Sequence, residues 1–320
     1  MTRSFVAGGA GFVGSHLTRA LLRRHDQEVI VYDNLVSGSE AHLRDVLSHP
    51  RLKLVVADLQ SLDDVLQETV GVDHVYLFAA NPDIAAAVDD PGIDFWQGTY
   101  LTHNVIEAAR INEVRRITYA SGSGVYGDRG EEEVDEEFGP LIPVSTYGAS
   151  KLACEGMLAA YSHMFGIDAV IFRFANVVGA RQTHGVTYDF VRRLLEEPTH
   201  LRILGDGTQS KSYIHVSDVV SAMLTLTDRG WSGYDVFNAG TGDYITVTEI
   251  ADLVVGRLGL EGVRYEYTGG ARGWKGDVPI VRFRSDKLEA LDWRCAHSSA
   301  EALIDSIDAN IAEARDVARR

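Results

Sequence analysis

The residues Tyr147 and Lys151 have the types and the spacing of an acid–base pair. They begin and end the segment Tyr147-Gly148-Ala149-Ser150-Lys151, and residues four apart share one face of a helix. A phenol normally keeps its proton up to about pH 10, but a neighbouring cation stabilises the phenolate. Such a phenolate could take the proton of a substrate hydroxyl while a hydride leaves the same carbon. A surface helix pair without chemistry is the alternative, because Tyr-x-x-x-Lys often occurs by chance.

A glycine-rich turn near the N-terminus could bind the hydride acceptor. The sequence GGAGFVG at residues 8–14 follows a predicted strand and opens a predicted helix. Gly8 permits a tight turn, Gly11 lets a pyrophosphate approach the backbone, and Gly14 lets the helix pack against the strand. The start of the helix would present unpaired N–H groups and partial positive charge to the phosphates. This context predicts a dinucleotide site; a glycine turn that binds no ligand is the alternative.

Acidic residues end the next two predicted strands. Asp33 lies 19 residues after Gly14, where a carboxylate accepts hydrogen bonds from a ribose diol. It would repel a 2′-phosphate, and no arginine is immediately beside it, so NAD is favoured over NADP. Asp58 ends the third predicted strand, where it could contact adenine or cap the helix that begins near Ser61.

Alternating apolar segments and amphipathic patterns predict an α/β fold. The predicted strands are at 4–7, 28–33, 52–57, 74–79, 117–120 and 168–174, and the predicted helices at 12–24, 99–110, 147–165, 186–197 and 247–258. Strands that alternate with helices form a parallel sheet with both faces covered. We therefore expect a Rossmann-like, doubly wound parallel sheet with a smaller C-terminal α/β lobe that binds the substrate.

The domain boundary is expected near residue 175. Residues 1–175 would form the NAD-binding domain, with residues 214–240 returning to it, while residues 176–213 and 241–320 would form the smaller lobe. Residues 128–146 interrupt the pattern with two acidic triplets and two prolines. A charge run of this kind predicts a solvated surface loop.

Composition excludes several other functions. The 320 residues carry 30 basic and 46 acidic side chains, and the net charge of −16 argues against binding nucleic acid or an anionic membrane. There is no apolar run of about 18 residues and no signal peptide, so no membrane span is expected. The two cysteines, Cys154 and Cys295, exclude a disulfide framework and a four-cysteine zinc site, and they fit a reducing cytoplasm. The 11 histidines form no His-x-x-x-His pattern, so no metal is expected.

The motifs together resemble one enzyme family. Besides the glycine turn and the Tyr147–Lys151 pair, they lie at 78–82, 125–128, 173–179, 184–186, 205–209, 213–218 and 272–278. They are similar to those of extended short-chain dehydrogenases/reductases of the NAD-dependent nucleotide-sugar epimerase/dehydratase family, and within it to archaeal-type UDP-glucose 4-epimerases. The resemblance covers nearly the whole chain. It implies an NAD-dependent 4-epimerase of the UDP-glucose/UDP-galactose or UDP-glucuronate type that acts through a transient 4-keto sugar.

The resemblance also implies the site residues. Tyr147 would be the catalytic base, and Lys151 its partner and a ribose ligand. NAD would contact Gly8, Gly11, Phe12, Val13, Gly14, Asp33, Asn34, Ser37, Gly38, Asp58, Leu59, Ala79, Ala80, Tyr147 and Lys151. The nucleotide-diphosphate sugar would contact Asn81, Ser123, Asn176, Lys211, Tyr213, Arg272 and Asp277. Lys211 takes the place of an arginine that usually binds the diphosphate, and related enzymes form homodimers through a four-helix bundle of the helices at 99–110 and 147–165.

Two further positions, Gly98 and Gly122, depart from the family pattern. Gly98 stands where an asparagine usually contacts the cofactor. Gly122 stands four residues before Tyr126, where a serine or threonine usually bonds the reacting hydroxyl, and glycine cannot relay a proton. Ser121, Ser123 or a water could take over this catalytic role, or the glycine could make room for a bulkier sugar. Ser123 and Gly124 occupy the places where dehydratases and decarboxylases carry further acid–base groups, which favours epimerisation. A dehydratase, a decarboxylase, a 4-ketoreductase and an inactive NAD-binding protein are the alternatives.

Overall fold

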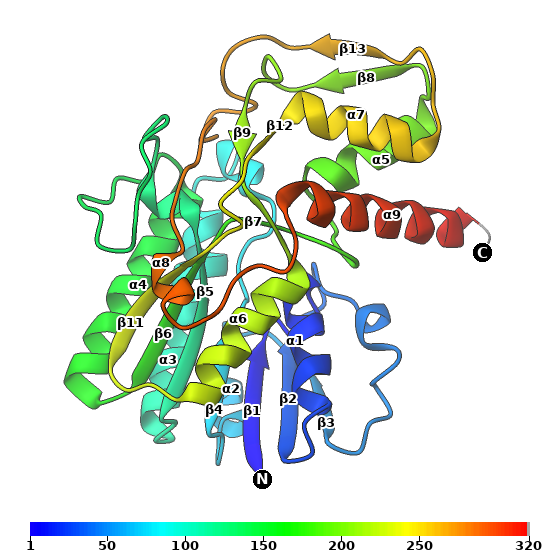
Figure 1. Cartoon of the computed structure of the whole chain (residues 1–320). Coiled ribbons are helices and arrows are strands. Elements are labelled where there is room, and N and C mark those ends of the chain that lie inside the picture. The colour runs from blue at the N-terminus through cyan, green and yellow to red at the C-terminus, as the bar shows by residue number, and fades with distance from the viewer. Residues whose placement is uncertain (319–320) are drawn as a thin grey trace. The chain divides into compact units, whose positions relative to one another are not determined.

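The computed structural model describes residues 1–318, which form two compact units (Figure 1). Unit 1 comprises residues 1–125, 146–173 and 220–237, and unit 2 comprises residues 126–145, 174–219 and those from 238 onward. The division expected from the sequence counted residues 126–145, 174–175, 214–219 and 238–240 with the first domain. In the structure their contacts group them with unit 2.

Unit 1 is built on a parallel sheet of seven strands in the order β11-β6-β5-β4-β1-β2-β3. The strands are β1 (Thr2–Ala7), β2 (Gln27–Asp33), β3 (Leu52–Val56), β4 (His74–Leu77), β5 (Arg116–Gly122), β6 (Asp168–Phe174) and β11 (Tyr234–Ala239). The order 3-2-1-4-5-6 is that of doubly wound dinucleotide-binding folds, and the winding direction reverses between β1 and β4. The predicted Rossmann-like α/β fold is confirmed.

Helices cover both faces of this sheet, which explains why its strands are apolar. The helices of unit 1 are α1 (Phe12–Leu22), α2 (Leu62–Glu68), α3 (Tyr100–Ile111), α4 (Thr146–Phe165) and α6 (Val216–Arg229), of which residues 216–219 are grouped with unit 2. All seven residues of β6 are buried, as expected for a strand between two helix layers. Helices α2, α3 and α4 share one core cluster with one face of the sheet, and Tyr76 points to the opposite face, where its hydroxyl bonds Thr227 of α6.

Unit 2 contains three two-stranded sheets and a helical core. The sheets are β7 (Asn176–Val178) with β10 (Tyr213–His215), β9 (Ser210–Lys211) with β12 (Ile245–Thr246), and β8 (His200–Ile203) with β13 (Arg264–Tyr267). The helices are α5 (Val186–Glu196), α7 (Val247–Leu258), the short α8 (Asp286–Glu289) and α9 (Ser299–Ala318). Apolar residues of α5, α7 and α9 form one buried cluster. Within residues 1–318 no helix is both long and apolar enough to cross a membrane.

The acidic segment 128–146 is irregular up to the start of α4, as predicted, but it is also tied down. Three of its carboxylates pair with arginines: Asp128 with Arg272 at 2.7 Å, Glu131 with Arg282 at 3.0 Å and Asp135 with Arg284 at 3.1 Å. Val134 adds two backbone hydrogen bonds, from its N–H to the carbonyl of Arg282 and from the N–H of Arg284 to its own carbonyl. Single exposed ion pairs contribute little, so the combination with backbone pairing is what binds the loop.

Candidate functional site

The glycine turn leads from β1 into α1 without a capping side chain. Gly8 has a φ of 77°, in the left-handed region that glycine adopts without strain. Gly11 is the N-cap of α1, and it makes no side-chain capping bond. The first N–H groups of a helix have no intrahelical partner, so this end of α1 presents donors and partial positive charge. Phe12 and Val13 form the start of the same helix, and the turn fits a dinucleotide diphosphate.

Close packing around the turn requires glycine, which has no side chain, at positions 8 and 14. A Cβ atom at Gly14 would lie 2.2 Å from the carbonyl oxygen of Gly8 and 2.8 Å from Cα of Gly9. A Cβ atom at Gly8 would lie 2.9 Å from the backbone nitrogen of Ala79, just beyond the end of β4. The structure therefore brings the glycine turn against the segment that carries Ala79 and Ala80.

Asp33 connects the end of β2 to the glycine turn. Its Oδ2 accepts a hydrogen bond from the N–H of Ala10 and its Oδ1 one from the N–H of Leu35, both at 2.9 Å. The backbone of Gly38 approaches so closely that a Cβ atom there would lie 2.6 Å from Oδ1. Asp33 is buried, whereas Asn34 and Ser37 of the following loop are exposed. A carboxylate held beside the start of α1 is placed as a ribose ligand would be.

Asp58 lies beside the same loop. Its Oδ2 accepts a hydrogen bond from Nδ2 of Asn34 at 3.2 Å, and its Oδ1 one from the N–H of Gln60 at 2.9 Å. Leu59 is buried. The alternative that Asp58 caps α2 is wrong, because Ser61 is the N-cap and its own hydroxyl accepts the N–H of Asp64.

Tyr147 and Lys151 lie on the first two turns of α4, as their spacing predicts. The Nζ atom of Lys151 donates to the carbonyl oxygen of Ala120 at 2.8 Å and lies 5.5 Å from the centre of the Tyr147 ring. The same Nζ atom also lies 4.9 Å from the ring centre of Tyr119. Burial holds the pKa of the Tyr119 phenol well above its ordinary value. Tyr119 therefore stays neutral. Lys151 is buried and Tyr147 is partly exposed, so a cation lies beside a phenol ring that solvent can reach.

The two candidate serines near Gly122 differ in their environment. Ser121 is buried, and its hydroxyl donates to Oε1 of Glu155 at 2.6 Å. Ser123 is partly exposed, and its side chain makes no hydrogen bond to any residue that the structure describes. Ser123 opens a short 3-10 turn, Ser123–Tyr126, that lies against the start of α4: a Cβ atom at Gly124 would be 3.7 Å from Cα of Gly148.

Glu155 is a residue that the sequence reasoning missed. It follows Lys151 by four residues, so the same spacing rule that singled out Tyr147 places it on the same helix face. Its carboxylate pairs with Arg173 of β6 at 2.7 Å. The signal available in the sequence was a glutamate one helical turn beyond Lys151.

Asn81 also has its polar atoms engaged inside unit 1. It is buried, and its Nδ2 donates to Oδ1 of Asp94 at 3.0 Å. The other carboxylate oxygen of Asp94 accepts the hydroxyl of Thr146 at 2.7 Å, and its backbone carbonyl accepts the hydroxyl of Ser150 at 2.8 Å. Asn81 and Asp94 thereby anchor the first turn of α4, next to Tyr147.

Four of the residues expected to bind the nucleotide sugar lie together in unit 2. Lys211 pairs with Asp277 at 2.6 Å, and the other oxygen of Asp277 accepts the N–H of Gly273 at 3.0 Å. Asn176 and Tyr213 are directly paired in β7 and β10. The side chain of Asn176 also hydrogen-bonds to the Tyr213 phenol, and burial raises the pKa of that phenol, so it remains neutral.

Arg272 borders this cluster. It directly precedes Gly273, and its guanidinium pairs with Asp128. Lys211 and Arg272 are thus two cations held by carboxylates, a set that can bind an anionic group when the carboxylates are outcompeted.

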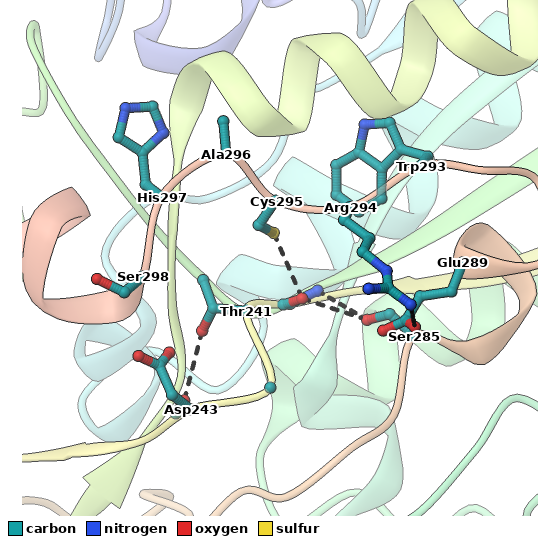
Figure 2. Close-up of a pocket in the computed structure, with 12 residues that line it drawn as sticks. Thr241, Asp243, Ser285, Glu289, Trp293, Arg294, Cys295, Ala296, His297 and Ser298 are labelled. Atoms are coloured by element: carbon teal, nitrogen blue, oxygen red, sulfur yellow. Dashed lines mark hydrogen bonds and ion pairs between the residues drawn. The ribbon is translucent and has the colours of Figure 1, made fainter.

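One cavity of unit 2 holds none of these residues. It measures about 450 Å³ and is lined by the 240–243 loop, Ser285, Glu289 and residues 293–298 (Figure 2). Cys295 donates from its thiol to the carbonyl of Gly240, and burial raises its pKa to about 12, so it is not a nucleophile at neutral pH. Figure 2 shows Arg294 reaching toward Glu289 across one side of the cavity. Among residues 1–318 there is also no group of three or more histidine, cysteine or acidic side chains that could hold a metal ion.

Comparison with known proteins agrees with this geometry. The model of a family described as the NAD dependent epimerase/dehydratase family matches residues 4–240. The UDP-glucose 4-epimerase of Mycolicibacterium smegmatis is 32% identical over 263 residues, which are 80% of this chain and 83% of that protein. A crystal structure of a UDP-galactose 4-epimerase is 36% identical and superimposes with a TM-score of 0.86 over 98% of this chain and 99% of that one. The dTDP-glucose 4,6-dehydratase of Streptomyces venezuelae, solved with NAD, is 28% identical, with a TM-score of 0.90 over 99% of this chain and 98% of that one.

Proposed function

Because the chain belongs to the NAD dependent epimerase/dehydratase family, we propose that it is a nucleotide-sugar 4-epimerase acting on a UDP-sugar, with glucose/galactose or glucuronate as the sugar. The observation that carries the proposal is the Tyr147–Lys151 pair on α4, in the same unit as an uncapped helix start that fits a dinucleotide. The UDP-glucose and UDP-galactose 4-epimerases among its relatives support the reaction class.

Residues of unit 1 would hold NAD. The diphosphate would bind the start of α1 at Gly11, Phe12, Val13 and Gly14, beside Gly8. The adenosine ribose would bind Asp33, with the adenine near Asp58 and Leu59; Asn34, Ser37, Gly38, Ala79 and Ala80 would complete the site. When bound, NAD accepts a hydride from the sugar and returns it.

Tyr147 would act as the general base. Its phenolate would take the proton of the sugar 4-hydroxyl, and the phenol would return the proton after the 4-keto sugar has turned over. Lys151 would stabilise the phenolate, since its ammonium lies 5.5 Å from the ring centre, and it would bind the nicotinamide ribose. Ser123 would bond the reacting hydroxyl in place of the residue missing at Gly122.

Residues of unit 2 would hold the nucleotide diphosphate. The proposed contacts are Lys211, Asn176, Tyr213, Arg272 and Asp277. In this chain of net charge −16, Lys211 and Arg272 would provide the local positive charge that a diphosphate requires. Asn81 and Ser121 have their side chains bonded inside unit 1, so the proposed sugar contacts do not depend on them.

We expect Lys211→Gln to raise the KM for the nucleotide sugar by about 10- to 100-fold, the loss of one charge-assisted hydrogen bond. The turnover number should change much less, because the diphosphate is bound equally in the ground and transition states. Steady-state kinetics measure both constants. Lys53→Gln is the matched control, since Lys53 is an exposed lysine paired with Glu68 in unit 1. An unchanged KM in Lys211→Gln would show that Lys211 does not bind the substrate.

Epimerisation and elimination are distinguished by their products. Removal of water across C5 and C6 requires a further acid–base pair, and the family resemblance implies that Ser123 and Gly124 take the places of that pair in this chain. The protein is incubated in deuterated water with UDP-glucose, UDP-glucuronate and their N-acetyl relatives, and the products are identified by NMR. We expect the C4 epimer without deuterium at C5. Recovery of only keto, unsaturated or decarboxylated sugars would contradict the proposal.

A 4,6-dehydratase is the second candidate. The dTDP-glucose 4,6-dehydratase of Streptomyces venezuelae superimposes with a TM-score of 0.90, as well as the epimerases do. Deuterium incorporation at C5 in the same experiment would favour this candidate.

We also propose that the protein is a homodimer formed by α3 and α4 of two copies. Small residues line an exposed stripe of α4: Ala149, Ala153, Gly156 and Ala160. Phe95 and Trp96 are also exposed apolar residues, and they lie in the π turn Phe95–Thr99, which contacts α4. A monomer rarely exposes a large contiguous apolar patch, and α3 and α4 from two copies would form a four-helix bundle.

Gly156→Arg should therefore give a monomer. Arginine favours a helix more than glycine does, and a Cβ atom at Gly156 meets nothing within 4 Å, so the fold should survive. Light scattering coupled to size exclusion measures the mass. Gly256→Arg, at an exposed glycine of α7 with equally open surroundings, is the control and should remain dimeric. A wild-type protein that is monomeric at micromolar concentration would refute the dimer.

A further inference from the structure

Unit 1 contains a buried ion pair beside the proposed catalytic helix. Nη2 of Arg173 on β6 lies 2.7 Å from Oε2 of Glu155 on α4, and Nε lies 3.1 Å from Oε1. The side chains are 5% and 3% exposed, respectively. Ser121 of β5 donates to the same carboxylate at 2.6 Å. We refer to Ser121, Glu155 and Arg173 as the α4 lock.

Stability alone does not explain this arrangement. Desolvation of two charges offsets most of their attraction, and well-packed apolar residues often stabilise a core as well as or better than a buried ion pair. On α4 the lock is flanked by two fully buried residues, Cys154 and Leu158. Hydrogen bonds have defined directions, so they fix the position of α4 more specifically than apolar contacts do.

The lock lies one helical turn from Lys151. Two consecutive residues of β5 hold two successive turns of α4: the carbonyl of Ala120 accepts the ammonium of Lys151, and the hydroxyl of Ser121 bonds Glu155. Arg173 ties the same turn to β6. Together these bonds determine the rotation and the height of α4 against the sheet at the position of Lys151.

The α4 lock also neutralises the negative charge of Glu155 next to Lys151. Lys151 and Glu155 are four residues apart on one helix face, so an unpaired Glu155 would attract the ammonium along the helix. The bidentate contact with Arg173 neutralises that carboxylate. The ammonium of Lys151 is then directed toward Ala120 and the rings of Tyr119 and Tyr147.

We propose that Ser121, Glu155 and Arg173 are positioning residues that hold Lys151 in place for its partner Tyr147. The inference rests on the proposed role of Lys151 as a ligand of the nicotinamide ribose and partner of the base. It assigns Ser121 to the support of α4, through Glu155, rather than to contact with the sugar.

The test is a variant that removes the lock without leaving an unpaired buried charge. In Ser121→Ala/Glu155→Met/Arg173→Met all three polar groups are replaced by apolar ones, so we expect a Tm near that of the wild type. The turnover number should fall by about 100-fold, the effect of displacing a catalytic group by about 1 Å. The KM for the sugar should stay within about threefold, and NAD should bind about tenfold more weakly by titration calorimetry.

Two further variants make the result decisive. Leu158→Ala creates a cavity on the same helix without touching the lock, so it should lower the Tm but keep the turnover number and the NAD affinity. Glu155→Asp keeps the charge but shortens the side chain; it tests the proposal if the triple variant does not fold, and should lower the turnover number by about tenfold. Folded triple or Glu155→Asp variants with wild-type turnover and NAD affinity would overturn the proposal.

The experiments distinguish refutation of the positioning role of the α4 lock from refutation of the 4-epimerase proposal. If the wild type is inert on every nucleotide sugar, the 4-epimerase proposal fails, and the NAD affinities of the folded triple variant and of Leu158→Ala still test the lock. If the wild type is active and neither measurement distinguishes the triple variant from it, only the lock is refuted.

Discussion

Tyr147→Phe is expected to lower the turnover number by about 1,000-fold, within the range that general acid–base catalysis contributes. The substitution removes only the phenol oxygen, so the ring that faces Lys151 at 5.5 Å stays in place and NAD binding should change little. Fixed-time assays with the nucleotide sugar that NMR identifies as the substrate measure the turnover number. Titration calorimetry measures NAD binding.

Tyr161→Phe provides the matched control for this experiment. Tyr161 is on the same helix, and its hydroxyl donates to Glu107, away from Lys151. It should retain the wild-type rate. Unchanged turnover in Tyr147→Phe would show that another group removes the proton, and an equal loss in both variants would indicate general damage to α4.

Gly14→Ala is expected to weaken NAD binding by at least about 100-fold, since displacement of binding groups by about 1 Å is this costly. The added Cβ atom would lie 2.2 Å from the carbonyl oxygen of Gly8 and 2.8 Å from Cα of Gly9. Both are backbone atoms, so no side chain can rotate away. Helix α1 must shift from β1, and its first N–H groups move away from the phosphates. Overpacking of this kind also costs about 1–3 kcal/mol of unfolding free energy.

Gly256→Ala is the same substitution in an open environment. Gly256 is exposed in α7, and a Cβ atom there meets nothing within 4 Å. It should raise the unfolding free energy by about 0.5–1 kcal/mol, because alanine favours the helix, and leave NAD binding unchanged. Calorimetric titration and thermal unfolding compare the two variants. NAD affinity in Gly14→Ala equal to that of the wild type would contradict a dinucleotide site at this turn.

Features that depend on neighbours in sequence could be predicted from the sequence. The glycine turn, the strand ending at Asp33 and the helix carrying Tyr147 and Lys151 are found within a few residues of where they were expected. Apolar runs and the four-residue spacing report local burial and helix faces, and alternating strands and helices leave few ways to build a sheet. The parallel, doubly wound sheet followed from the same rules, and the order of its strands came from the structure.

Only the tertiary structure decided which polar groups meet. Ser121, Glu155 and Arg173 are brought together by three different elements, β5, α4 and β6, and Asn81 meets Asp94 at the start of α4. The arginines of residues 272–284 lie about 150 positions along the chain from the acidic loop that they bind. Hydrophobic periodicity shows that a residue is buried, but a buried charge or amide needs a partner, and the topology of the fold determines which one is within reach.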